Sequence, residues 1–247
     1  MKQFTNENVN IHRPTAITIG KFDGLHRGHV TLIEEMKKMA TLQGLATAIL
    51  TFSPHPMAFF TKTHMPLILD PHEKAELFGQ LGIDYYIQYK FDENFAHTTP
   101  RDFIEKILCT QLNAKMLVVS SDYRFGKGGA GDVDFARKAG KDMGLEVHVI
   151  QNLLNQQQQK ISSNLLRGLI MDKEFKLVAQ LCGRPFFISG KTDENGIITP
   201  HPDKILPPDG VYEVDIHGHG NTVIKIGGGV VKSDIKQSQA LKIHFMV

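Results

Sequence analysis

The sequence predicts an α/β fold with a parallel sheet, followed by a small antiparallel β unit. From Thr15 to about Ile150, short β-branched runs alternate with longer helical patterns, which is typical of a parallel sheet with right-handed crossovers. After Gly183, glycine and proline become frequent and helical periodicity vanishes, which favours short strands joined by turns. We therefore expect one domain over residues 1–183 and a second over residues 184–247.

The first domain contains five candidate strands separated by helices. The strands are expected at Ala16–Ile19, Ala46–Thr51, Asp84–Gln88, Met116–Val119 and Glu146–Ile150. The helices are expected at His29–Gln43, His72–Leu81, Pro100–Leu112 and Asp132–Met143. Thr99-Pro100 supports the third helix, because it supplies a cap residue and then a proline at the first helical position. Ligands of parallel sheets bind beyond the carboxyl ends of the strands, so functional residues are expected in the loops there.

The chain changes in character after the last of these strands. The polar, glutamine-rich residues 151–160 predict an exposed loop. Two short helices are expected next, at Ser163–Ile170 and Asp172–Cys182. The strands of the second domain are expected at Phe186–Gly190, Gly210–Ile216, Asn221–Ile226 and Ala240–Phe245.

Composition limits the classes of function. The 247 residues are 41% hydrophobic and 22% charged, which is ordinary for a globular protein. A net charge of +2 provides no strong field for nucleic acid or an acidic membrane. No segment approaches the roughly twenty apolar residues of a membrane span, and residues 1–13 lack the apolar core of a secretory signal. Cys109 and Cys182 match no C-x-x-C pattern. We expect a cytoplasmic protein with no nucleic-acid or membrane partner.

Two histidines follow the first predicted strand. The chain runs from Gly20 through a glycine-rich turn to His26 and His29, where a helix begins. Unpaired N–H groups and the helix dipole favour anions at such a point, so a phosphate chain would fit. The alternatives are two surface histidines or half of a metal site, and a zinc site would need further ligands close by. The His-x-Gly-His pattern resembles the signature of α/β nucleotidyltransferases, which have a Rossmann-like fold and release pyrophosphate.

A second polar motif opens the first short helix after the glutamine-rich stretch. Ser162 and Ser163 stand at its start, with Arg167 one turn later. Hydroxyls and a guanidinium in this order suit phosphate oxygens. The alternative is an ordinary helix cap with a solvated arginine. Together with the histidine pair, the phosphate-binding interpretation is favoured.

Four stretches in this order resemble the bacterial bifunctional riboflavin kinase/FAD synthetase family. They begin at Gly20, Thr51, Asp122 and Ile161, with the sequences GKFDGLHRGH, TFSPHP, DYRFG and ISSNLLR. The resemblance covers roughly residues 14–184. It implies an FMN adenylyltransferase domain that converts FMN and ATP, with Mg²⁺, into FAD and pyrophosphate.

The resemblance also implies roles for individual residues. The implied catalytic residues are His26, His29, Ser163 and Arg167. The implied ATP-binding residues are Gly20, Phe22, His26, His29, Ser162, Ser163, Asn164 and Arg167. The implied flavin-binding residues are Pro54, His55, Pro56, Asp122 and Phe125. For Pro54 and Phe125, core packing is an equally good explanation. No protein-built metal site is expected, since Mg²⁺ would bridge phosphate oxygens.

The chain departs from the family pattern at two places. Asn164 stands where the family's S-S-T-x-x-R motif has threonine, and its amide can still donate a hydrogen bond. The family's kinase motif P-T-A-N is missing between Lys191 and His201, and the chain ends before the region expected to complete a kinase site. We therefore expect a reduced barrel without riboflavin kinase activity. The alternatives are an adenylyltransferase with another phosphate acceptor and a non-catalytic flavin- or ATP-binding pseudoenzyme.

Overall fold

The computed structural model describes residues 1–152 and 160–246, which form two compact units. The α/β unit comprises Met1–Phe22, Gly28–His64 and Ala75–Leu153. The barrel unit comprises Asp23–Arg27, Met65–Lys74 and Leu154–Val247. The two units differ in extent from the domains expected from the sequence, whose boundary at residues 183 and 184 stays a prediction. Among the described residues, no helix has the length and apolar character needed to cross a membrane.

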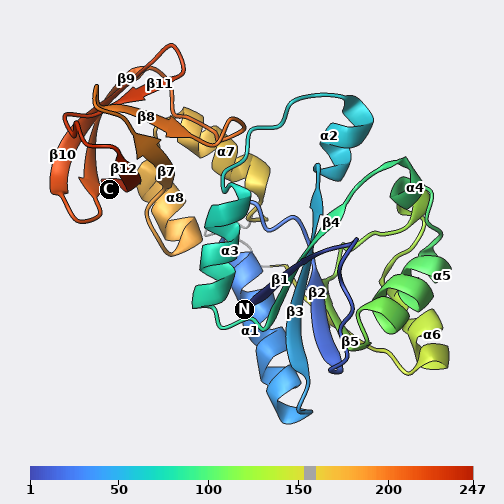
Figure 1. Ribbon diagram of the computed structural model, residues 1–247. Coiled ribbons are helices and arrows are strands. Elements are labelled where there is room, and N and C mark those ends of the chain that lie inside the picture. Colours follow the sequence, from blue (N-terminus) through green and yellow to red (C-terminus); the bar gives the residue numbers. More distant parts are fainter. Residues whose placement is uncertain (153–159, 247) are drawn as a thin grey trace. The chain divides into compact units, whose positions relative to one another are not determined.

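A six-stranded parallel sheet forms the centre of the α/β unit (Figure 1), which confirms the predicted fold class. Its strand order is β1-β4-β3-β2-β5-β6. The strands are β1 (Lys2–Thr5), β2 (Thr15–Ile19), β3 (Ala46–Ser53), β4 (Tyr85–Lys90), β5 (Ala114–Ser120) and β6 (Glu146–Ile150). All five predicted strands are present. Sequence patterns missed β1, because this short, largely exposed strand pairs only at the sheet edge with β4.

Helices cover both faces of the sheet (Figure 1). They are α1 (Arg27–Leu42), α2 (Pro56–Thr61), α3 (Pro71–Gln80), α4 (Glu93–Ala96), α5 (Pro100–Asp102), η1 (Phe103–Gln111), η2 (Lys127–Gly129) and α6 (Val133–Met143). The helix predicted at Pro100–Leu112 is present as α5 and η1, and most of it is π-helical, with wider hydrogen-bonded turns. Its buried residues are the predicted ones, Phe103, Ile104, Ile107 and Leu108.

The strand order creates a topological switch point between β2 and β5. The chain leaves β2 toward β3 on one side and leaves β5 toward β6 on the other. The loops that follow β2 and β5 therefore diverge at the carboxyl edge of the sheet. In open α/β sheets this crevice is where ligands bind. The loop after β2 carries the histidine motif, and the loop after β5 carries the predicted flavin-binding residues Asp122 and Phe125.

The barrel unit is a closed antiparallel barrel accompanied by two helices. The barrel strands are β7 (Phe187–Thr192), β8 (Ile197–Pro200), β9 (Gly210–Ile216), β10 (Gly220–Gly227), β11 (Val230–Lys232) and β12 (Gln239–Phe245). The helices α7 (Ser163–Met171) and α8 (Phe175–Cys182) share its apolar core. The predicted strands are confirmed, and the short strands β8 and β11 were missed. The helix predicted at Asp172–Cys182 begins at Phe175, three residues after the predicted start, because Lys173 adopts a left-handed φ of 62°. The predicted loop over 151–160 lies largely outside the described residues.

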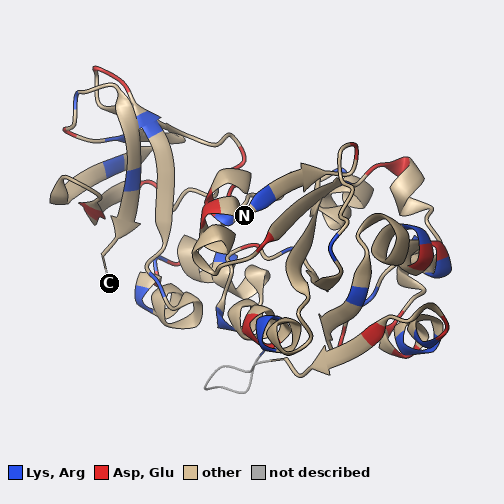
Figure 2. Cartoon of the chain, turned by 60° about the horizontal axis from the view of Figure 1, so that its bottom comes forward, with Lys and Arg blue, Asp and Glu red and all other residues tan. Residues whose placement is uncertain are grey.

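Charged residues of both signs are interspersed along the helices, as Figure 2 shows. On α1, Lys37 pairs with Glu34 at 3.0 Å and Lys38 pairs with Glu35 at 2.6 Å. Such exposed pairs contribute little to stability, typically well under about 1 kcal/mol. Their main effect is to keep this surface free of a single-signed field.

Candidate active site

The turn between β2 and α1 is held in an unusual backbone conformation. Gly20 donates its N–H to the carbonyl of Leu50 at 3.1 Å, and Phe22 and Leu25 have φ values of 49° and 39°. Gly24 has a φ of 84°, and a Cβ added there would lie 2.6 Å from a methyl group of Leu166. Two non-glycine residues in the left-handed region cost free energy, of order 1–3 kcal/mol each. Such strain is typical of functional sites.

His29 is the third residue of α1 and is half-buried. Its ring meets the edge of the Phe22 ring, with centroids 5.1 Å apart. Phe22 is fully buried and packs in turn on Phe78 at 5.8 Å. Phe22 therefore supports the ring of His29. The contact between Phe22 and ATP stays a prediction. The position of His29 in the first helical turn places it among the N–H groups that favour anions.

His26 is buried, with 5% of its surface exposed. Its pKa is lowered from 6.5 to about 4, mainly by burial and also by the positive charges of Lys160 and Arg184. The imidazole is therefore neutral at pH 7 and carries one N–H donor. A neutral donor can still bind a phosphate oxygen, but without the full charge of an imidazolium.

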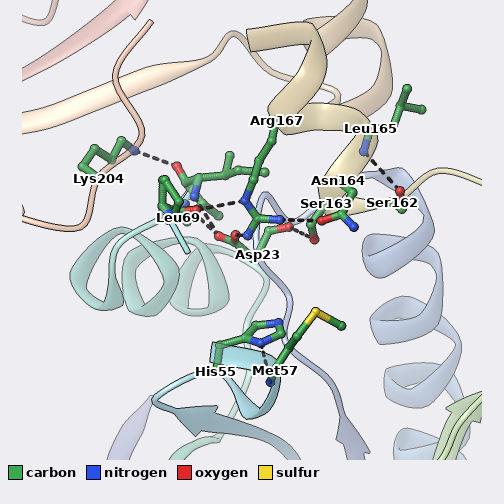
Figure 3. Close-up of polar contacts among 12 residues, drawn as sticks. Asp23, His55, Met57, Leu69, Ser162, Ser163, Asn164, Leu165, Arg167 and Lys204 are labelled. Atoms are coloured by element: carbon green, nitrogen blue, oxygen red, sulfur yellow. Dashed lines mark hydrogen bonds and ion pairs between the residues drawn. The ribbon is translucent and has the colours of Figure 1, made fainter. Parts of the chain in front are cut away.

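Asp23 is a central residue of the site that sequence reasoning did not single out. Its Oδ1 accepts hydrogen bonds from the backbone N–H groups of Ile68 and Leu69, both at 3.0 Å. Its Oδ2 forms an ion pair with Nη2 of Arg167 at 2.5 Å (Figure 3). Only 4% of the Asp23 side chain is exposed. A carboxylate this buried requires compensation, and these three donors provide it.

Three groups fix the guanidinium of Arg167. Besides the ion pair with Asp23, Nε donates to the carbonyl of Pro66 at 2.9 Å and Nη1 donates to Oδ1 of Asn164 at 3.0 Å. Arginine has five N–H donors, so these bonds leave two for a ligand. The side chain is 16% exposed. The structure thus presents Arg167 as a pre-oriented donor with limited access to solvent.

The two serines of the motif have different roles. Ser162 caps α7, since its Oγ accepts the N–H of Leu165 at 3.2 Å (Figure 3). Ser163 donates its hydroxyl to the carbonyl of Asp23 at 2.7 Å. The helix-cap alternative therefore describes Ser162, whereas Ser163 joins Asn164 and Arg167 beside Asp23. Their contact with ATP stays a prediction.

A cavity of about 230 Å³ opens in the α/β unit at the carboxyl ends of β3, β4 and β5. Aromatic side chains dominate its wall, namely Phe52, Phe60, Phe91, Phe95, Phe103, Tyr123 and Phe125. The rest of the cavity wall includes Pro56, Arg124 and the glycines 126, 128 and 129. Flat aromatic walls suit a planar aromatic ligand, since offset and edge-to-face contacts are favourable.

Two of the five predicted flavin-binding residues line this cavity. They are Pro56 and Phe125, and Phe125 is also part of the apolar core. Pro54, His55 and Asp122 are not among the lining residues. His55 caps α2 by accepting the N–H of Met57 at 3.0 Å (Figure 3). Asp122 accepts hydrogen bonds from Ser120 and Asn152. Their contact with a flavin stays a prediction.

Tyr123 contributes its aromatic ring to the cavity wall. Its ring stacks on Phe125 at 5.3 Å with an interplanar angle of 14°. Its hydroxyl is buried and has no hydrogen-bond partner among the described residues, and burial raises its pKa. A buried hydroxyl without a partner costs free energy.

Comparison with known proteins identifies the family. A family model described as FAD synthetase matches residues 8–165. The chain belongs to this family. A FAD synthetase of Listeria monocytogenes is 33% identical over 87% of this chain and 88% of that protein. A bifunctional riboflavin kinase/FMN adenylyltransferase of Escherichia coli K12 is 32% identical over 93% of this chain and 77% of that protein.

The fold of this FAD synthetase family member also matches a solved structure. A crystal structure titled macrolide-efflux protein from Streptococcus pneumoniae superposes with a TM-score of 0.85. The superposition covers 99% of this chain and 89% of that chain. The sequences are 22% identical, so the likeness concerns the fold alone. The FAD synthetase match includes both histidines, both serines and Asp23, and ends two residues before Arg167.

The described part of this FAD synthetase family member contains no group of three or more His, Cys, Asp or Glu side chains arranged to hold a metal ion. A magnesium ion that enters with a nucleotide keeps several waters and takes most of its other ligands from phosphate oxygens.

Proposed function

We propose that the protein transfers the adenylyl group of ATP to FMN, which gives FAD and pyrophosphate. The observation that carries this proposal is the aromatic cavity, which lies on the same unit as the helix-terminal His29 and at the sheet edge where ligands bind. Family membership and the activities for which the relatives are named support it. A Mg²⁺ ion accompanies ATP as part of that substrate.

In the proposed reaction a phosphate oxygen of FMN attacks the α-phosphorus of ATP, and the bond to the pyrophosphate oxygen breaks. The nucleophile is already an anion, so no side chain has to remove a proton from it. The neutral state of His26 at pH 7 is compatible with this, since the residue acts as a donor. His26 and His29 stabilise the charge that develops on the phosphate oxygens, as preorganised donors do.

The serine motif is proposed to bind the β- and γ-phosphates. Ser163 and Asn164 stand in the first turn of α7, with Ser162 directly before it and Arg167 one turn later. The two N–H donors of Arg167 that its protein partners leave over suit phosphate oxygens. Gly20 and Phe22 act by shaping the turn and supporting His29.

The flavin ring is proposed to occupy the aromatic cavity. Phe125 and Pro56 form part of its wall, and Pro54, His55 and Asp122 contribute from the flanking segments. The ring of Tyr123, which stacks on Phe125, adds a further aromatic surface to this wall.

The barrel is proposed to have no riboflavin kinase activity. The segment between Lys191 and His201, where the family's P-T-A-N would stand, here forms the end of β7, a turn and β8. Its Thr192, Asn195 and Thr199 do not stand in the P-T-A-N order that the resemblance assigns to nucleotide and magnesium binding.

One pair of incubations tests both parts of the proposal. Purified protein is incubated with ATP and Mg²⁺, once with FMN and once with riboflavin, and the flavins are separated by chromatography. We expect FAD and pyrophosphate from FMN, and no FMN from riboflavin. Tight FMN binding without FAD would instead support the pseudoenzyme alternative. FMN formed from riboflavin would overturn the statement on the kinase.

A further inference from the structure

The segment Pro66–Leu69 binds both members of the Asp23–Arg167 ion pair. The carbonyl of Pro66 accepts the Nε–H of Arg167, and the N–H groups of Ile68 and Leu69 both donate to Asp23. All of these residues belong to the barrel unit. The geometry of the guanidinium therefore depends on where this segment lies.

The barrel unit fixes the other edge of the same segment. Leu67 donates its N–H to the carbonyl of Asp203 at 2.7 Å, and Ile205 donates to the carbonyl of Leu67 at 2.8 Å. The ammonium of Lys204 donates to the carbonyl of Ile68 at 2.7 Å (Figure 3). Segment 203–205 thus holds segment 66–69 along one side, while Asp23 and Arg167 bind it from the other.

A buried ion pair anchors this arrangement. Nζ of Lys204 lies 2.5 Å from Oε2 of Glu73, and neither side chain has any exposed surface. The other oxygen of Glu73 accepts the N–H of Ser189 on β7 at 2.9 Å. Glu73 and Asp70 also accept each other's N–H groups, a capping box at the start of α3.

The main effect of such a buried ion pair is to fix the positions of its groups, and its contribution to stability is small. Desolvation of two buried charges offsets much of their attraction, so a buried pair is weak evidence for stability. Burial lowers the pKa of Lys204, and the carboxylates of Glu73, Asp70 and Asp23 oppose that effect. Lys204 also lies over the rings of Phe186 and Phe187 at 5.4 and 5.2 Å. Each of these partners restricts the position of the ammonium.

We propose that Lys204 and Glu73 are positioning residues for Arg167, and that the barrel thereby forms part of the framework of the ATP site. This inference rests on the proposed function, in which Arg167 binds ATP phosphates. It assigns the barrel a function that does not require kinase chemistry. A guanidinium that is displaced or free to rotate loses affinity for phosphate oxygens, because orientation would have to be fixed on binding.

The test compares the Michaelis constants of the two substrates. Lys204→Met removes the bond to Ile68 and leaves Glu73 without its cation. The double variant Lys204→Met/Glu73→Gln removes both charges, so it keeps the buried cluster balanced if the single variant fails to fold. Lys176→Met, on the exposed face of α8 in the same unit, is the matched control. Circular dichroism and thermal unfolding establish that each variant is folded.

We expect the KM for ATP to rise about tenfold in the variants, equivalent to roughly 1.4 kcal/mol of binding. The KM for FMN stays unchanged, because every residue that lines the aromatic cavity belongs to the α/β unit. A general loss of folded protein would instead lower kcat and leave both Michaelis constants alone. An unchanged KM for ATP in the folded double variant, or equal changes for both substrates, would overturn the inference.

Calorimetric titration with ATP separates this inference from the proposed function. Wild-type protein that binds ATP and makes no FAD contradicts the proposed function, and the inference is then decided by the ATP affinities of the same variants. We expect about tenfold weaker ATP binding in the double variant and no change in the Lys176→Met control. Equal affinities would refute the inference, and wild-type protein that binds no ATP would refute both.

Discussion

Asp23 and Arg167 stand 144 positions apart in the sequence and form a largely buried ion pair at 2.5 Å. Asp23 follows β2 in the histidine motif, whereas Arg167 ends the serine motif on α7. The pair therefore joins the two segments that the sequence predicts to bind phosphate. Through this pair, a change in either motif alters the side-chain geometry of the other.

Replacement of Asp23 distinguishes its charge from its hydrogen bonds. Asp23→Ala leaves the N–H groups of Ile68 and Leu69 without their acceptor and the guanidinium of Arg167 without its counter-ion. We expect a loss of about 3–5 kcal/mol in the free energy of unfolding. Asp23→Asn keeps an acceptor for both N–H groups, so the loss should be smaller, about 1–2 kcal/mol. Denaturant unfolding measures both values.

The control for these variants is Asp134→Ala, which removes an exposed partner of Arg137 on α6. Its effect should stay within about 0.5 kcal/mol. Equal stabilities for Asp23→Ala and Asp23→Asn would show that the two backbone donors do not depend on the carboxylate.

His29→Ala tests the predicted phosphate donor. Loss of one preorganised donor at developing charge typically lowers kcat by about 10²–10³-fold, and we expect a loss of this size in FAD formation. FMN affinity, followed by quenching of flavin fluorescence, should not change, because His29 is not among the cavity residues. His12→Ala, at an exposed position, is the control. Near-normal turnover with an intact fold would remove His29 from the mechanism.

His26 predicts a specific pH dependence of stability. Its pKa is about 4 in the folded protein, against 6.5 when unfolded. Between these values the unfolded state binds more protons, so stability falls as the pH drops from about 6.5 to 4. From pH 7 to pH 5 this residue should account for about 2 kcal/mol of lost stability.

His26→Gln removes that titration. The free energy of unfolding of the variant should therefore fall less between pH 7 and pH 5 than that of the wild type. The measurement is denaturant unfolding at several pH values. Curves that run parallel over this range would show that the folded protein does not hold His26 neutral.

The elements of the α/β fold were predictable because their signals are local. Strand β2 is a run of β-branched residues buried on both faces, and α1 carries an apolar stripe at helical spacing. Thr99 caps its helix through its hydroxyl, as the Thr99-Pro100 pair predicts. The π-helical hydrogen-bond pattern of η1 was not predictable, since it buries the same residues that an α-helix would.

The site was predictable only where its residues are neighbours in sequence. The histidine pair and the serine motif are local patterns. The partner of Asp23 was not predictable, because ion pairing across 144 positions leaves no spacing signal. The aromatic cavity was not predictable for the same reason, since its residues are far apart in the sequence. Phe52, Phe91 and Phe125 lie at or after the ends of three different strands.

Gly131 provides a test of the aromatic cavity that substitutes none of its lining residues. Gly131 and Phe125 exchange backbone hydrogen bonds at 2.9 and 3.0 Å, and a Cβ on Gly131 would lie 2.8 Å from the Phe125 ring. Gly131→Ala must therefore displace the ring, and we expect the KM for FMN to rise at least about fivefold, a change of roughly 1 kcal/mol, with the KM for ATP unchanged. Gly79→Ala on α3, where an added Cβ meets no atom within 4 Å, is the control and should leave both constants unchanged. If Gly131→Ala changed the KM for ATP instead, the cavity beside Phe125 would have to be assigned to the nucleotide rather than to the flavin.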